Sequence, residues 1–148
     1  MLIEDITQSG AIPTLEASLR FASLRQRFIA GNIANISTPD YRQKNVSVAD
    51  FRSELARAVD ARRGATGGER GALELRSTQE LRVEGPGPSN FRLEPRTASG
   101  NILFHDRNNR DTEGLMQDLV ETGQEFRYAS EMLRSRFELL KAAIAQRA

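Results

Sequence analysis

The chain has 148 residues, of which 39% are hydrophobic and 28% are charged, and its formal net charge is +1. This length fits one modest domain, or a small domain with extended appendages, and the hydrophobic share is too low for a single large core. The near-zero net charge gives no electrostatic footprint for nucleic acid, and the lack of cysteine with a single histidine, His105, excludes disulfides, thiol chemistry and histidine-cluster metal sites.

No membrane-spanning segment is predicted, because no apolar run approaches the roughly 20 residues needed to cross a bilayer. The stretch from Met1 to Asp5 lacks the basic and apolar regions of a cleavable secretory signal. We therefore expect the chain either to stay in the cytoplasm or to leave it by a route that uses no such signal.

The first predicted element is a long helix that starts near Pro13, a residue suited to a first helical turn, and ends near Asn35. At 1.5 Å per residue it would be ~35 Å long. Its apolar residues alternate at spacings of three and four, which is the seam of a heptad repeat. The seam residues are Ile12, Leu15, Leu19, Ala22, Ile29, Ile33 and Ile36, interrupted only by Gln26. Phe21, Leu24 and Phe28 widen the stripe, so the helix requires neighbours on several sides.

An Asn/Pro motif marks the predicted end of this helix. It reads Asn32-Ile33-Ala34-Asn35-Ile36-Ser37-Thr38-Pro39-Asp40-Tyr41. Pro39 has no amide proton and biases Thr38 toward an extended backbone, which predicts a helix end and a turn. Asn32 and Asn35 share one helix face, and we assign them to hydrogen bonding between helices or subunits near this exit. With Tyr41 these residues form the predicted signature turn.

Residues 37–110 form a predicted middle region without long regular elements. Val46, Val48 and Phe51 predict a short strand or an extended arm. Residues 51–59 follow with apolar positions at helical spacing, which predicts a short amphipathic helix.

Glycine-rich stretches separate the remaining predicted elements of the middle region. Residues 64–71 contain four glycines and predict a flexible loop. Residues 72–76 alternate apolar and polar side chains as a strand does, and residues 81–83 are a weaker strand candidate. Residues 85–90 interrupt any regular structure, and neither glycine-rich stretch matches a phosphate-binding loop.

A second long helix is predicted from Asp111 to about Arg147, a stretch without proline. Asp111 or Thr112 can cap its start, and a continuous helix here would be ~55 Å long. Its apolar seam follows the heptad spacing over about four repeats. The seam residues are Met116, Leu119, Gly123, Phe126, Ser130, Leu133, Phe137, Leu140 and Ile144.

The predicted fold is mainly α, with two long terminal heptad helices that pack as a coiled coil or bundle around a small irregular, partly β middle. The predicted boundaries are 1–36, 37–110 and 111–148. Because the longer helix overhangs the shorter one, one chain cannot cover both apolar stripes, and we expect neighbouring subunits to complete the burial. The residues predicted to carry this assembly are Leu15, Leu19, Ile29, Ile33, Met116, Leu119, Phe126, Leu133, Phe137, Leu140 and Ile144.

The Asn/Pro motif resembles the signature of flagellar basal-body rod and hook proteins, in which an Asn-Ile-Ala-Asn helix end is followed by Thr-Pro-Gly-Tyr. Asp40 stands where glycine is usual, and glycine adopts a positive φ more freely than aspartate. Further similarities follow in the same order along the chain and point to a proximal rod protein. They are Phe51-Arg52-Ser53-Glu54-Leu55, Ala72-Leu73-Glu74-Leu75-Arg76-Ser77-Thr78, Asn108-Asn109-Arg110-Asp111 and Phe126-Arg127-Tyr128, with Arg110 in place of an apolar residue.

This resemblance implies a structural subunit of the bacterial flagellum that needs no cofactor. Family members pack their terminal helices into a rod that crosses the periplasm and transmits torque. The implied partners are copies of the chain, other flagellar rod proteins, inner-membrane ring and rod-adaptor proteins, and the flagellar type III export apparatus, which exports them without a cleaved signal. Phe51 and Leu55 match an apolar pattern that the export gate recognises, and they equally suit the buried face of a short helix.

Two other functions compete with a rod subunit. A cytoplasmic coiled-coil adaptor that binds helical partners would explain the heptads but not the Asn/Pro motif or the order of the middle segments. An enzyme is disfavoured, because the nearest catalytic pair, His105-Asp106, consists of adjacent residues that rarely orient each other. No catalytic, cofactor or metal site is predicted.

Overall fold

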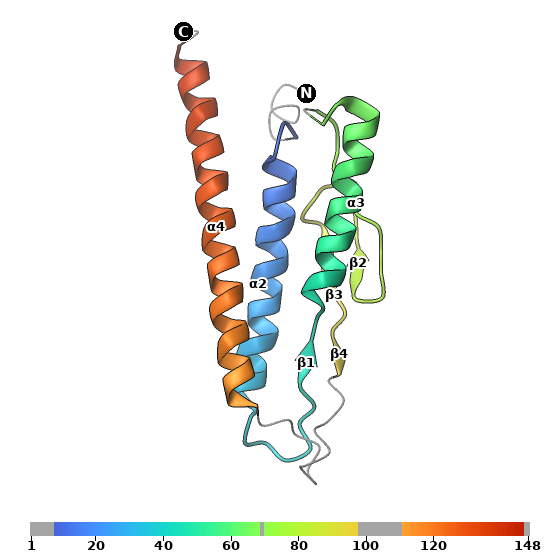
Figure 1. Cartoon of the computed structure of the whole chain (residues 1–148), viewed down its shortest axis with the longest axis vertical. Helices are drawn as coiled ribbons and strands as arrows, with labels where there is room; N and C mark the ends of the chain where they lie inside the picture. Colours follow the sequence, from blue (N-terminus) through green and yellow to red (C-terminus); the bar gives the residue numbers. More distant parts are fainter. Residues whose placement is uncertain (1–7, 69, 98–110, 147–148) are drawn as a thin grey trace.

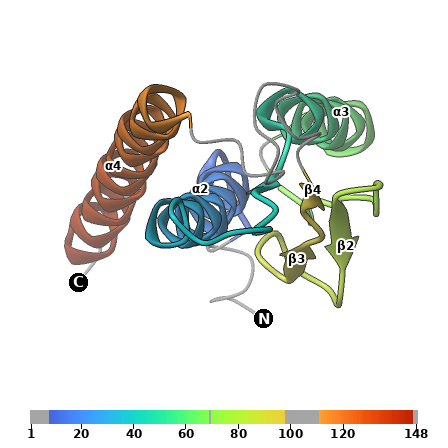
Figure 2. The same cartoon turned by 90° about the horizontal axis from the view of Figure 1, so that it is seen from below.

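The computed structural model describes residues 8–68, 70–97 and 111–146. Within these residues three helices lie side by side, and two small sheets pack against them (Figure 1). The helices are α2 (Ile12–Ala34), α3 (Val48–Thr66) and α4 (Thr112–Ala145). Helix α2 lies between α4 on one side and α3 with the strands on the other (Figure 2). The prediction of two long helices around a small, partly β middle is thus confirmed.

The two long helices run antiparallel, and their ends follow the sequence signals (Figure 1). Pro13 occupies the first turn of α2, where its missing amide proton costs no hydrogen bond. Helix α4 begins after Asp111, whose Oδ1 accepts the Gly114 N–H at 2.9 Å and caps the helix as predicted.

Helix α3 is about twice as long as the helix predicted for residues 51–59. Ser47 caps its start, since its Oγ accepts the Asp50 N–H at 3.1 Å, and Gly67 ends it with a φ of 74°. The segment between these caps is rich in alanine and arginine, which are strong helix formers. The helix therefore includes Val48, which was predicted in a strand or arm, begins three residues before the predicted start at Phe51, and runs through Gly64.

Two antiparallel strand pairs make up the sheets. β1 (Lys44–Asn45) pairs with β4 (Arg96–Thr97), and β2 (Leu81–Val83) pairs with β3 (Phe91–Leu93). The β2–β3 hairpin confirms the weaker strand candidate, and the predicted break at residues 85–90 is its loop.

The stronger strand candidate, residues 72–76, is not a strand. Side chains of α3 bind its backbone instead: Glu54 Oε1 accepts the Arg76 N–H at 2.6 Å, and Arg57 Nη2 donates to the Glu74 carbonyl at 3.1 Å. The predicted alternation still appears in the burial, because Leu73 is buried whereas Glu74 and Arg76 are exposed. The alternating pattern thus predicts which side chains point inward but not the hydrogen-bond partner.

The core lies between α2, α3 and the hairpin. The rings of Phe21 and Phe51 stack with centroids 4.0 Å apart and planes 5° apart, and the Phe91 ring lies 6.0 Å from Phe51. Each phenylalanine comes from a different element, so the stack joins the three. The other buried members of this cluster are Ala17, Val46, Ala58, Leu73, Leu81 and Leu93.

A buried arginine connects the end of α3 to the start of α2. Arg62 Nη1 donates to the Gly10 carbonyl at 2.8 Å, and its Nη2 donates to the Gln8 carbonyl at 2.5 Å. Its Nε donates to the Arg70 carbonyl at 3.3 Å in the loop after α3. One side chain thus holds three backbone carbonyls, and α2 begins at a fixed place relative to α3.

Candidate assembly interface

The seam between α2 and α4 contains small buried side chains. On α4 the buried residues are Leu115, Thr122 and Ala129, which are spaced seven apart along the helix. Ala22 and Ile29 are buried on α2. Small side chains at the middle of this seam allow the two helix axes to approach closely.

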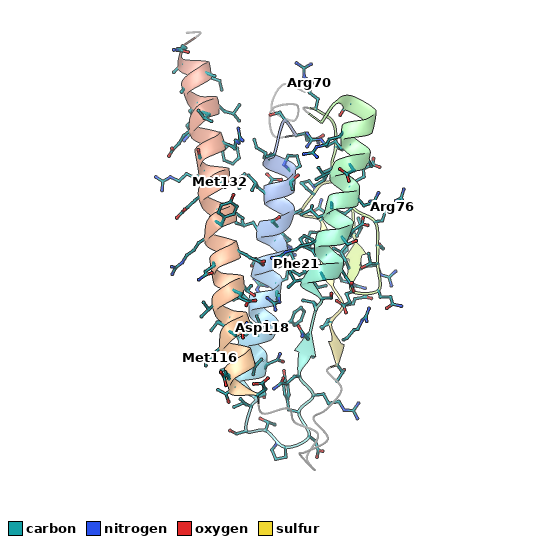
Figure 3. The ribbon with its side chains drawn as sticks, in the orientation of Figure 1. Phe21, Arg70, Arg76, Met116, Asp118 and Met132 are labelled. Carbon is teal, nitrogen blue, oxygen red and sulfur yellow. The ribbon has the colours of Figure 1, made fainter. Side chains whose placement is uncertain are left out.

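A polar cluster interrupts the apolar seam. The Arg25 side chain on α2 is buried, and its Nη1 donates to Thr122 Oγ1 at 2.5 Å. Its Nη2 forms an ion pair with Asp118 Oδ1 at 2.6 Å, and Asp118 is labelled on α4 in Figure 3. The Arg25 Nε is buried and has no hydrogen-bond partner within the described part of the chain. A buried arginine held by two groups of another helix ties the helices together at one position.

Much of the apolar surface of α4 is uncovered. Helix α4 extends beyond the start of α2, so its C-terminal part has no neighbouring helix among the described residues (Figure 1). Large apolar side chains remain exposed along its length, and Ile144 is 60% exposed. The exposed large apolar residues are Met116, Val120, Tyr128, Met132, Phe137, Leu139 and Ile144, of which Met116 and Met132 are labelled in Figure 3. A monomer rarely exposes so many large apolar side chains on one helix unless that surface binds a partner.

The predicted assembly residues fall into two groups. Those on α2 contact the body of the chain: Ile29 is buried, and Leu15, Leu19 and Ile33 are half-buried. Those on α4 are covered less: Leu119, Phe126, Leu133 and Leu140 are half-buried, and Met116, Phe137 and Ile144 are exposed. The residues that α4 does bury lie next to the predicted seam, on the flank that faces α2.

An apolar groove lies where the three helices meet. It encloses about 170 Å³, and its lining includes Leu15 of α2, Leu55 of α3 and Tyr128 of α4. Arg52 of α3 and Glu125 of α4 form an ion pair at its rim. Of the predicted export pair, Phe51 is buried in the core and Leu55 is half-buried in this groove.

The signature turn is a set of hydrogen bonds within the chain. Asn32 is 3% exposed, and its Nδ2 donates to the Lys44 carbonyl at 2.8 Å. Its Oδ1 accepts the Lys44 N–H at 2.9 Å and the Tyr41 hydroxyl at 3.2 Å. The Asn32 amide thus connects α2 to the β1 backbone of the same chain, and its assignment to hydrogen bonds between helices or subunits stays a prediction.

The second asparagine closes the end of the helix. Asn35 Nδ2 donates to the Gly31 carbonyl at 2.9 Å, and its Oδ1 accepts the Thr38 hydroxyl at 3.3 Å. These bonds lie within the chain, and the assignment of Asn35 to hydrogen bonds between helices or subunits stays a prediction. After Pro39, Asp40 adopts a φ of 59°, the left-handed conformation that glycine adopts without strain.

Three glutamates have shifted pKa values: Glu16, Glu54 and Glu94, whose pKa is lowered chiefly by the hydrogen bond from Arg92. The pKa of Glu54 is lowered, chiefly by the hydrogen bonds from Arg57 and further by the Arg76 N–H. The pKa of Glu16 on α2 is raised by burial. Glu54 thus contributes stability when ionised, whereas ionised Glu16 reduces it.

The interface contains residues that sequence patterns did not identify. Arg25 sits beside the heptad seam and reads as an exposed polar residue, and Thr122 is a polar residue in an apolar stripe. No local sequence pattern predicts this pairing, because the partners of Arg25 lie more than ninety residues away in the sequence. No role was predicted for Glu54 either, although its carboxylate accepts a backbone hydrogen bond from Arg76 in the segment 72–76.

The described residues contain no group of three or more histidine, cysteine, aspartate or glutamate side chains placed to hold a metal ion. Among the same residues, no helix is long and apolar enough to cross a membrane. The pair His105-Asp106 lies outside the described residues. Residues 108–110, which resemble a segment of flagellar rod proteins, lie outside them as well.

Comparisons with known proteins agree on one group. The chain is 28% identical to the flagellar basal body rod protein FlgB of Bacillus subtilis (strain 168), over 92% of this chain and 94% of that protein. It is 33% identical to the proteins of that name from Escherichia coli (strain K12) and Shigella flexneri, over 63% of this chain and 72% of each of those proteins. No family model matches the chain.

Proposed function

This chain belongs to the flagellar basal body rod protein FlgB family, and on that premise we propose that it builds the rod through the uncovered apolar surface of α4. As a member, the chain is a structural component of the basal-body rod. The proposal adds that it assembles with copies of itself and other rod proteins, and that this assembly carries torque across the periplasm.

One observation carries the proposal: the C-terminal part of α4 is exposed and apolar. The C-terminal part of α4 extends beyond the start of α2 (Figure 1), and Phe137 and Ile144 of α4 are exposed. Burying a large apolar side chain stabilises an interface by about 1.5–3 kcal/mol. Helices from neighbouring subunits are suitable partners, because Phe137 and Ile144 are seven residues apart and continue the heptad spacing of a helical seam.

The experiment compares Phe137→Glu and Ile144→Glu with Ser135→Glu, a change of the same charge at an exposed polar position of α4. We expect all three purified chains to unfold at the wild-type urea concentration, because none of the three residues is buried. Only the first two variants should fail to assemble in sedimentation experiments and fail to restore swimming in a deletion strain. Wild-type assembly and swimming by Phe137→Glu and Ile144→Glu would refute the proposal.

The same proposal includes contacts at the base of the rod and a route out of the cell. The expected partners there are inner-membrane ring and rod-adaptor proteins, and the expected route is the flagellar type III export apparatus, without a cleaved signal. Phe51 and Leu55 are the candidate export pair. Since Phe51 is buried in the core, an export gate could bind it only in the unfolded chain.

A secretion assay can separate an export role from a packing role. Phe51→Ala removes both the candidate signal and a core side chain, whereas Phe91→Ala removes a core side chain alone. An export signal at Phe51 predicts that only the Phe51→Ala variant is retained in the cell. Equal secretion of both variants would leave Phe51 with a packing role only.

A further inference from the structure

Two repetitive helices can pack in more than one register. The residues that α4 buries against α2 recur every seven positions, at Leu115, Thr122 and Ala129. A slide of α4 by one heptad is about 10 Å at 1.5 Å per residue, and it would return two of these three side chains to α2, with Arg136 or Asn108 at the third position. Two of the three seam positions are thus equivalent in each register, so apolar burial alone does not fully specify the observed one.

Arg25 distinguishes the observed register from its neighbours. In this register it has a carboxylate at Asp118 and a hydroxyl at Thr122. One heptad toward the start of α4, the corresponding residues are Asp111 and Leu115, and one heptad toward its end they are Glu125 and Ala129. Neither displaced pair offers a hydroxyl.

The carboxylates of the displaced registers already have other roles. Asp111 caps α4 through the Gly114 N–H. Glu125 forms the ion pair with Arg52 of α3. A slide in either direction would thus leave part of the Arg25 guanidinium buried without an acceptor and would take a carboxylate from an existing contact.

We propose that Arg25 is the residue that fixes the register of α4 against α2, and so fixes how much of α4 extends beyond α2. In the antiparallel pair, Ile12 lies 13 residues before Arg25, which places it opposite about residue 133 of α4. The register therefore places the last three turns of α4 beyond the first residue of α2. Buried polar residues are best attested in this role, where they select one arrangement among several of similar stability.

The test uses distances between spin labels in the dilute monomer, so its outcome does not depend on rod assembly. The chain has no cysteine, and labels can be attached at Arg20→Cys on α2 and Gln124→Cys on α4, two exposed positions. We expect a single distance in the otherwise unchanged chain. With Arg25→Met added, we expect a second distance population that reflects a displacement of one heptad, about 10 Å along the helix axis.

Arg52→Met is the matched control. It also removes an ion pair between an arginine and a carboxylate of α4, but Arg52 is exposed whereas Arg25 is buried. It should retain a single distance. A folded Arg25→Met chain with the unchanged single distance would overturn the proposal, as would an equal second population in Arg52→Met. If Arg25→Met does not fold, the triple variant Arg25→Met/Asp118→Leu/Thr122→Val replaces it, since it leaves no buried polar partner. A single distance in the triple variant would also overturn the proposal. So would its failure to fold, because the proposal gives Arg25 the role of selecting the register and not of holding the two helices together.

Discussion

The side-chain amide of Asn32 pairs with the backbone of Lys44 through two hydrogen bonds, one donated at 2.8 Å and one accepted at 2.9 Å. A neighbouring strand would form the same two bonds with Lys44. A helix residue therefore takes the place of a strand beside β1. The end of α2 is fixed to the middle region by this pairing, which explains why the signature motif places an asparagine in the last turns of the helix.

Replacing Asn32 should destabilise the chain more than replacing Asn35. We expect Asn32→Ala to lower the free energy of unfolding by about 1–3 kcal/mol, because it leaves the Lys44 backbone groups without their partner. Asn35→Ala removes bonds at a more exposed site, and we expect a loss of about 0.5–1.5 kcal/mol. Urea unfolding measures both. Equal losses would contradict a special role for the Asn32–Lys44 pair.

Asp40→Gly should stabilise the chain. Aspartate at a φ of 59° pays a steric cost that glycine avoids, and we expect a net gain of about 0.5–1 kcal/mol after the greater freedom of glycine in the unfolded state is subtracted. Asp40→Val should have the opposite effect, because a β-branched side chain is disfavoured at positive φ. Thermal unfolding of the two variants should give midpoints on opposite sides of the wild-type value; a lower midpoint for Asp40→Gly would show that the Asp40 side chain contributes more than its strain.

Stability should fall in acid because of Glu54. Its pKa in the folded chain lies below the ordinary value of 4.5, so its contribution is fully present above pH 4.5 and is lost as the pH falls through the folded value. Glu54→Gln should reduce stability at pH 7 and flatten the dependence of the unfolding free energy on pH below 4.5. Urea unfolding between pH 7 and pH 3 measures this.

Glu16→Gln provides a control of opposite sign. Burial raises the pKa of Glu16, so the ionised group reduces stability at neutral pH and the penalty disappears as the pH falls through the raised value. We expect Glu16→Gln to increase stability at pH 7 and to leave the loss below pH 4.5 in place. If the unfolding free energy of Glu16→Gln did not fall below pH 4.5, the assignment of the acid loss to Glu54 would be contradicted.

Phe51→Ala should cost about 3–5 kcal/mol, the range for truncating a buried phenylalanine. The ring lies between those of Phe21 and Phe91, so its loss opens a cavity where three elements meet. Leu55→Ala, at a half-buried position one turn along α3, should cost less. Chemical denaturation of both variants tests the ranking, and a larger loss for Leu55→Ala would move the centre of the core from the phenylalanine stack to the groove.

Local signals predicted the long helices well. Pro13, the Asn/Pro motif and the acidic start of α4 act through groups only a few residues apart, and such signals can be read from the sequence. The heptad spacing likewise predicted that α4 would present an apolar stripe. Helix α3 was predicted too short, because its true caps, Ser47 and Gly67, lie outside the clear apolar pattern.

Interactions between distant residues were not predictable from these patterns. Asn32 was correctly chosen as a hydrogen-bonding residue, but the identity of its partner depends on where β1 returns to α2. Residues 72–76 have the composition of a strand, yet Glu54 and Arg57 bind their backbone. The Arg25 cluster joins α2 to α4, and a single sequence carries no record of that pairing.

The Arg62 contacts have a mechanical consequence. Helix α2 is fastened near its start by Arg62 and near its end by Asn32, and both fastenings lead to the same body of α3 and strands. A pull along the axis of α2 would therefore be resisted by hydrogen bonds near both ends of the helix. Helix α4 is bound in its first half, where Asp118 and Thr122 contact Arg25 and Glu125 pairs with Arg52, and its far end extends beyond the start of α2. The chain thus combines a stiff body with one long arm, and bending under load would be concentrated where that arm leaves the seam.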